Sequence, residues 1–155
     1  MENQLLKKEK EVKAQEIYNF IKKYPNIFLA PLEDFIIELG LPEYIYLFAR
    51  DIKGANIAKL ENALLTMDST AYICLFANDV EGASIEKIEN YVVEKRDLFL
   101  VYSFANEVEK ANVNRLEDII VEVKDPMYIY LFAKYVKGAN IERLQDAIIE
   151  IERSY

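Results

Sequence analysis

Histidine is absent from the 155 residues of the chain. Its absence excludes Ser–His nucleophile pairs, imidazole metal sites and the general base that enzymes use most often. Cys74 is the only cysteine, so the chain can form neither an internal disulfide nor a cluster of thiolate metal ligands. Walker, dinucleotide-binding and EF-hand spacings are also missing. We therefore expect no enzymatic activity, no cofactor and no bound metal.

Long apolar runs are missing too. No stretch approaches the roughly 18 apolar residues that cross a bilayer, and residues 1–15 lack the apolar centre of a secretory signal. A single cysteine also suits a reducing compartment. We expect a cytoplasmic protein with no membrane partner, in a bacterium or, if a phage encodes the chain, in the host cytoplasm.

Positive charge is scarce beyond Tyr24. The net charge is -8, and residues 1–24 hold six Lys and four Glu, a balance of +2. The remainder of the chain therefore carries 13 basic and 23 acidic groups, a balance of -10. An acidic surface repels phosphate backbones, so we expect no direct binding of nucleic acid.

A 28-residue repeat dominates what the sequence does contain. The pair Phe-Ala recurs at this interval, at Phe48-Ala49, Phe76-Ala77, Phe104-Ala105 and Phe132-Ala133. Residues 44–71 and 128–155 share thirteen identities in 28 positions. The register predicts a charged helical leader (1–15) and one repeat domain (16–155), made of the units 16–43, 44–71, 72–99, 100–127 and 128–155.

Each unit has the pattern of two short helices. Apolar residues of the first helix recur at i, i+3, i+4 and i+7, as in Ile45, Phe48, Ala49 and Ile52, which is helical spacing. A second helix repeats the spacing of Ile57, Leu60 and Leu64. A two-helix unit cannot bury its apolar stripe alone, and stacked neighbours can cover it. The sequence therefore predicts an all-α protein, an α-solenoid of five tandem two-helix repeats.

Capping residues support the same boundaries. Ser69, Asp97 and Asp125 precede the predicted first helices, and Asn or Ser precedes the second ones at 56, 84, 112 and 140. Gly54, Gly82 and Gly138 share one repeat position, where we expect the first helix to end in the left-handed conformation. Lys110 takes that position in the fourth unit, so its turn should be strained or altered.

The unit Y-x-Y-x-F-A-x(2)-V-K-G-A-N-I-x(2)-L-x(2)-A-I resembles short helical repeats in proteins of AT-rich bacteria and their phages. The resemblance covers residues 44–155 well and 16–43 weakly. In architecture it is similar to the TPR- and HEAT-like solenoids, whose members mostly bind proteins. The resemblance implies a protein-binding function and no catalytic residues.

One column on the first helices is aromatic, at Tyr18, Tyr46, Cys74, Tyr102 and Tyr130. Tyrosines supply contact area at low entropic cost, which binding surfaces often use. We take Tyr46, Arg50, Tyr102, Tyr130 and Lys134 as candidate partner-binding residues. The alternative is that the rings pack between neighbouring units.

A second surface is acidic and lies on the outer side of the second helices. It includes Glu94, Asp118, Glu122, Asp146 and Glu150. It fits a basic partner or a mimic of a phosphate backbone, as in phage-encoded inhibitors of host defence such as anti-CRISPR proteins; the alternative is an ordinary solvated face. Basic residues near the helix starts oppose the helix dipole, and we expect acids three residues on to compensate them.

The last unit keeps apolar side chains at Ile141, Leu144, Ile148 and Ile151. Terminal units of solenoids usually have a polar outer face, so these residues predict an exposed apolar edge, which either a homodimer or the target protein would cover. Three functions follow: a protein-binding scaffold, an acidic inhibitor, and a structural subunit that assembles with itself.

Overall fold

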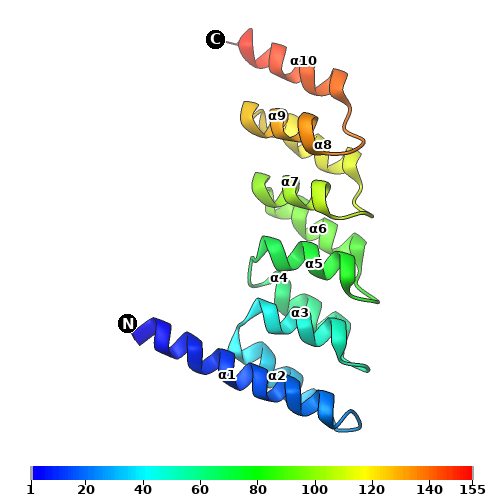
Figure 1. Ribbon diagram of the computed structural model, residues 1–155. Helices are drawn as coiled ribbons and strands as arrows, with labels where there is room; N and C mark the ends of the chain where they lie inside the picture. The colour runs from blue at the N-terminus through cyan, green and yellow to red at the C-terminus, as the bar shows by residue number, and fades with distance from the viewer. Residues whose placement is uncertain (1, 155) are drawn as a thin grey trace. The chain divides into compact units, whose positions relative to one another are not determined.

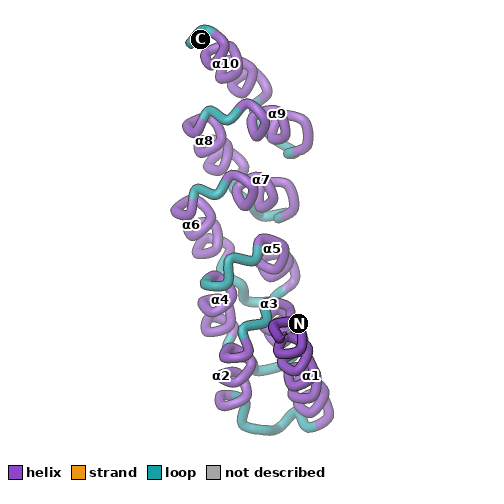
Figure 2. The backbone as a smooth tube through the Cα atoms, turned by 90° about the vertical axis from the view of Figure 1, so that its left-hand side faces the viewer, coloured by secondary structure: helices purple, strands orange, loops and turns teal. Residues whose placement is uncertain are grey.

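A computed structural model of the protein describes residues 2–154. Every regular element within this range is an α-helix, and no strand occurs between residues 2 and 154 (Figure 2). The all-α prediction is confirmed. Met1 and Tyr155, which bound the predicted leader and the fifth repeat, lie outside the described residues.

The chain divides into two compact units, residues 1–84 and 85–155. The helices are named in chain order (Figure 1). The first unit contains α1 (Glu2–Lys23), α2 (Ala30–Leu39), α3 (Pro42–Asp51), α4 (Ile57–Leu65) and α5 (Thr70–Asp79). The second unit contains α6 (Ile85–Lys95), α7 (Leu98–Glu107), α8 (Val113–Val123), α9 (Pro126–Tyr135) and α10 (Ile141–Glu152).

Odd-numbered and even-numbered helices lie on opposite sides of each unit. In the first unit α1, α3 and α5 form one side and α2 and α4 the other (Figure 2). The central helix α3 contacts α1, α4 and α5. In the second unit α7 and α9 face α6, α8 and α10, and α9 contacts α7, α8 and α10. The predicted leader is helical and continues without a break into residues 16–23 as α1.

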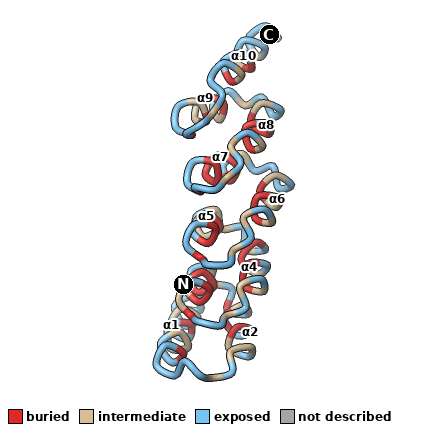
Figure 3. The backbone as a smooth tube through the Cα atoms, turned by 90° about the vertical axis from the view of Figure 1, so that its right-hand side faces the viewer, coloured by how far each residue is buried: buried red, intermediate tan, exposed pale blue. Residues whose placement is uncertain are grey.

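The apolar stripe of the sequence forms the core of each unit (Figure 3). Phe48, Phe76, Phe104 and Phe132 are each 0% exposed. The alanines that follow Phe48, Phe76 and Phe104 are 6–7% exposed. Burying each large apolar side chain stabilises the fold by roughly 1.5–3 kcal/mol. Phe20, at the same repeat position in α1, is the exception, because half of its surface is exposed.

Most of the predicted caps hold the helix starts, but the Ser69 side chain makes no cap hydrogen bond at the start of α5, so that prediction is wrong. The side chains of Asn56, Asn112 and Asn140 accept hydrogen bonds from backbone N–H groups in the first turns of α4, α8 and α10. Asp97 and Asp125 do the same for α7 and α9. These bonds satisfy donors that a helix start otherwise leaves unpaired.

The glycine turns differ in one detail from the prediction. Gly54, Gly82 and Gly138 do have positive φ (83°, 87° and 90°), but each lies two residues beyond the residue that caps the first helix. That cap residue is extended, as at Ile52. Lys110 is not among the positive-φ residues of the described chain. Its turn is therefore altered rather than strained, because the backbone avoids the conformation that a side chain disfavours.

A second left-handed position recurs at the ends of the even-numbered helices. Gly40, Asp68, Arg96 and Lys124 share one repeat position and have φ of 68°, 52°, 54° and 58°. Three of the four are not glycine, so a recurring glycine does not mark this conformation in the sequence. A non-glycine residue there costs roughly 1–2 kcal/mol relative to the right-handed region.

None of the helices between residues 2 and 154 is both long and apolar enough to cross a lipid bilayer.

Candidate protein-binding surfaces

A buried glutamate recurs at one repeat position on the even-numbered helices. Glu33, Glu61, Glu89 and Glu117 are between 1% and 6% exposed. Each carboxylate accepts a hydrogen bond, 2.7–2.8 Å long, from the backbone N–H of a residue 23 positions later. The donors are Asn56, Ser84, Asn112 and Asn140, which directly precede α4, α6, α8 and α10. Bonds to a charged acceptor are the stronger kind, so Glu33, Glu89 and Glu117 each fix the start of the next even-numbered helix within their own unit.

Basic side chains accompany these glutamates. Lys59 lies 3.6 Å from Glu33, Arg115 lies 3.2 Å from Glu89, and Arg143 lies 3.4 Å from Glu117. Arg143 also pairs with Asp118 at 2.6 Å. These pairs run between successive even-numbered helices. The expected compensation by acids three residues on within one helix is therefore not the arrangement that forms.

The first tyrosines of the aromatic column are engaged inside the first unit. Tyr18 on α1 donates its hydroxyl to Asp51 at the end of α3. Tyr46 on α3 donates to Asp79 at the end of α5 over 2.6 Å, and only 6% of it is exposed. Burial raises the pKa of Tyr46, and the hydrogen bond to Asp79 raises it further. These contacts match the packing alternative at Tyr18 and Tyr46.

Arg50 is exposed, but its guanidinium is already engaged. It makes two hydrogen bonds to the Asp51 carboxylate, at 2.6 and 2.8 Å, and donates to the Tyr46 hydroxyl at 3.0 Å. The hydrogen bond from Arg50 lowers the pKa of Asp51 to about 2, and burial of Asp51 opposes that shift. The cluster joins the end of α3 to its neighbours.

The column opens to solvent towards its last member. Tyr102 is half-buried, whereas Tyr130 on α9 is 55% exposed. Lys134 donates to the Tyr130 hydroxyl at 2.8 Å, and its Nζ lies 5.0–5.2 Å from the ring centroids of Tyr130 and Tyr135. We name Tyr130, Lys134 and Tyr135 the α9 cluster. Exposed aromatic rings beside a cation are common in recognition surfaces.

An apolar groove lies beside the α9 cluster. It has a volume of about 390 Å³ and is lined by α9 and α10, with Ile129, Ala133, Ile141 and Ile148 among its walls. Of the predicted edge, Ile141 is 44% exposed, and Ile148 and Ile151 are half-buried. Leu144 is 1% exposed, which corrects its assignment to an exposed edge, because it belongs to the contact of α10 with α9.

The acidic surface is exposed as predicted, but bases are interspersed in it. Glu94, Asp118, Glu122, Asp146 and Glu150 are all exposed. Glu122 pairs with Arg96 at 3.1 Å, and Glu150 pairs with Lys124 at 3.3 Å. With Asp118 paired to Arg143, three of the five carboxylates have a cation beside them. The pairing reduces the resemblance of this surface to an uninterrupted row of phosphates.

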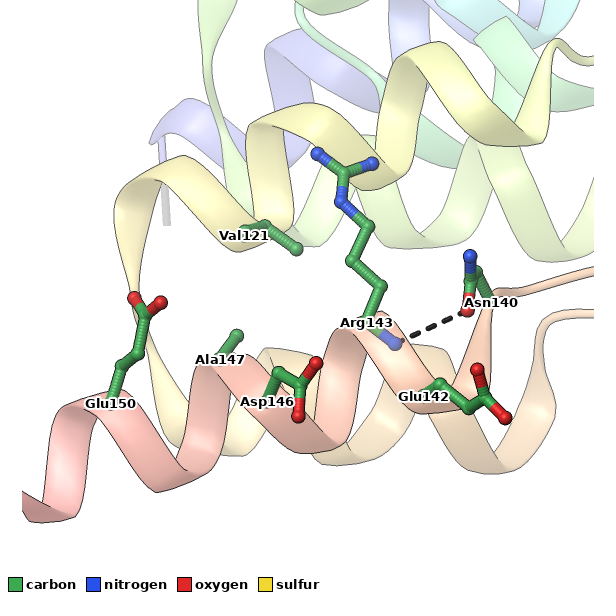
Figure 4. Close-up of a pocket in the computed structure, with 7 residues that line it drawn as sticks. All are labelled: Val121, Asn140, Glu142, Arg143, Asp146, Ala147 and Glu150. Atoms are coloured by element: carbon green, nitrogen blue, oxygen red, sulfur yellow. Dashed lines mark hydrogen bonds between the residues drawn. The ribbon is translucent and has the colours of Figure 1, made fainter.

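Part of this surface is an open pocket of about 510 Å³ between α8 and α10. Glu142, Asp146 and Glu150 follow one another along α10 at intervals of four residues (Figure 4). Arg143 extends from the same helix towards α8, and its backbone N–H donates to the Asn140 side chain (Figure 4). The pocket offers carboxylates to a basic group and has one cation inside it.

No group of three or more His, Cys, Asp or Glu side chains within residues 2–154 is placed to hold a metal ion. Cys74 is buried, with 1% of its surface exposed, and forms no disulfide.

Comparisons with known proteins supply no relative for this chain. No protein-family model, no curated protein and no solved structure matches it.

Proposed function

We propose that the protein is a non-enzymatic protein-binding scaffold, in which five helix pairs stack in chain order as one α-solenoid. The regular recurrence of the buried glutamates, the capping residues and the buried phenylalanines supports this arrangement. In such arrays each pair is stabilised by its neighbours, and the outer surfaces are free to bind.

The observation that carries the proposal is the open end of the second unit. An apolar groove adjoins an exposed cluster of two tyrosines and a lysine on α9. Binding energy is usually concentrated in aromatic and cationic anchors set beside such a groove. Tyr130 and Lys134 are therefore the contact residues of the proposal, whereas Tyr46 belongs to the packing of the first unit.

Capture of partners from extracts of the native host tests the proposal. The full chain is immobilised as wild type, as Tyr130→Ala and as Phe99→Ala, the last being a matched control because Phe99 is 57% exposed on α7, away from the groove. We expect the control to retain the captured protein and Tyr130→Ala to lose at least tenfold of it, as anchor residues do. Equal capture by both variants would contradict the assignment of the site.

A second function, an acidic inhibitor that imitates a phosphate backbone, is favoured by the pocket between α8 and α10, with its row of three carboxylates. Reversing Asp146 and Glu150 to Lys separates the two functions. The inhibitor would lose its target and would also release it at high salt, since such binding is largely electrostatic. Binding at the α9 cluster would survive both changes.

A further inference from the structure

The two ends of the described chain expose complementary parts of one repeated contact. The four phenylalanines of the Phe-Ala pairs are fully buried, including Phe132 on α9, the last odd-numbered helix. Phe20, their equivalent on α1, is half exposed and contacts Tyr24 with ring centroids 4.9 Å apart. No helix pair precedes α1 among residues 2–154. In the later pairs, the preceding helix pair therefore covers this phenylalanine, and Phe20 on α1 lacks that cover.

The groove between α9 and α10 is uncovered on the side that faces a following pair, whereas α1 is uncovered on the side that faces a preceding pair. Ile120 on α8 is 0% exposed and Ala105 on α7 is 7% exposed, and α9 contacts both helices. Their equivalents Ile148 and Ala133 are only half-buried and line the groove. No helix follows α10 among residues 2–154, so the place that α9 takes in the previous pair is open there.

We propose that the α9–α10 groove receives α1 of a second copy of this chain, with Phe20 of that copy beside it. The inference rests on the proposed stacking of helix pairs, and it names the occupant of the same groove. In the proposed array, the groove of each helix pair receives the odd-numbered helix of the next pair. Among the odd-numbered helices, α1 is the one whose preceding side is uncovered.

Charge supports this occupant. Helix α1 carries six lysines and four glutamates, a balance of +2. Helix α10 carries four acids and one arginine, a balance of -3. Opposite balances on the two partners favour their encounter and disfavour the contact of two identical grooves, which would place α10 against α10.

The repeat position of the buried glutamates holds an uncharged residue in the last pair. Gln145 stands where Glu33, Glu61, Glu89 and Glu117 stand in the other pairs, and it lines the groove. Each of those glutamates accepts a hydrogen bond from the backbone N–H of the residue at the capping position of the next pair. The first pair offers Phe28 at the capping position and Pro31 where Lys59 follows the cap. A neutral amide at Gln145 leaves no buried, unpaired carboxylate when this pair docks.

The contact joins two different surfaces, so it is heterologous and extends from copy to copy. The expected product is an open chain whose mass grows with concentration, rather than a closed symmetric dimer. A symmetric dimer through the C-terminal repeat uses the groove twice and leaves α1 unused.

Sedimentation of the full chain and three variants tests the proposal. Phe20→Gln alters only α1, and Ile141→Gln alters only the groove. Phe99→Gln removes a phenylalanine of similar exposure that lies on neither of these two surfaces. Far-ultraviolet circular dichroism of each variant confirms that it is folded. We expect the wild type and Phe99→Gln to grow beyond dimers as concentration rises, and Phe20→Gln and Ile141→Gln each to weaken self-association at least tenfold.

Mixing the two defective variants gives the sharpest result. Each retains the surface that the other lacks, so an equimolar mixture should form a one-to-one dimer and grow no further. Assembly of Phe20→Gln alone at the wild-type affinity would identify a symmetric groove contact and overturn the proposal. A wild type that stays at 18.1 kDa at every concentration would also overturn it. Capture of a host protein by such a monomer would leave the scaffold function standing without this occupant.

Discussion

Removing the Glu117 carboxylate should loosen the start of α10 and little else. Glu117 is 1% exposed and accepts from the Asn140 N–H at 2.7 Å. A bond to a charged acceptor contributes roughly 1.5–3 kcal/mol. The pair with Arg143 adds less, about 0–1 kcal/mol, because that arginine side chain is 41% exposed. Glu117→Ala should therefore destabilise the start of α10 by about 1.5–4 kcal/mol.

Amide hydrogen exchange measures this loss where it occurs, which matters because helical arrays need not unfold in one step. The Asn140 amide should exchange roughly tenfold to several hundred-fold faster in Glu117→Ala, at about 1.4 kcal/mol for each factor of ten. The Asn112 amide provides an internal control, because it is held by Glu89 and should change little.

Gln145→Ala is the matched control variant. Gln145 has the same repeat position as Glu117 but is exposed, and its replacement should change the free energy of unfolding by less than about 0.5 kcal/mol. The reasoning is refuted if Glu117→Ala leaves exchange at Asn140 unchanged, or if both variants lower stability equally.

Three further predictions concern packing, backbone conformation and pH. Phe104→Ala should cost about 3–5 kcal/mol in urea unfolding and Phe20→Ala less than about 1, because only the first removes a fully buried ring; equal losses would contradict the burial difference. Lys124→Gly should be about 1 kcal/mol more stable than Lys124→Ala, since both lose the side chain and only glycine accepts φ of 58° without strain; the reverse order would show that the turn is not left-handed. Asp51 has a pKa of about 2, lowered from 3.8 chiefly by Arg50. The ionised carboxylate therefore contributes fully to the free energy of unfolding above about pH 4, and this contribution is lost as the pH falls towards 2. The urea midpoint of Asp51→Asn should fall less over this range than that of the wild type.

The apolar pattern predicted the helices well, because burial depends on spacing that the sequence displays directly. Phe48 and Leu60, each spaced at helical intervals from the other apolar residues of its own helix, are fully buried. Capping residues such as Asn112 were equally readable, since their side chains act on their own helix start. Local chemistry and a strict repeat are enough for such features.

Contacts between helix pairs were harder to foresee. The column that begins at Glu33 is visible in the sequence, yet a glutamate on a helix usually indicates a solvated face. Only the approach of the next pair shows that its carboxylate meets a backbone N–H 23 residues away. Tyr46 is a similar case, because its acceptor Asp79 lies on another helix.

The left-handed turns at Asp68 and Lys124 escaped prediction for a different reason. Aspartate enters the left-handed region more readily than most residues but does not require it, and a lysine gives no indication of it. Tyr135 was also missed as a member of the α9 cluster, because its position holds acids in the three preceding pairs, as at Asp51 and Asp79.

A chain shortened by one repeat tests the central claim most directly, namely that each repeat forms one interchangeable pair of stacked helices. Deletion of residues 98–125 joins Asp97 to Pro126, so that Asp97 takes the capping place of Asp125. Deletion of residues 112–125 removes a single helix and serves as the comparison. Circular dichroism during urea unfolding should show full ellipticity per residue and a cooperative transition for the first deletion, and loss of both for the second. Loss of helical structure in both chains, or its retention in both, would contradict the claim.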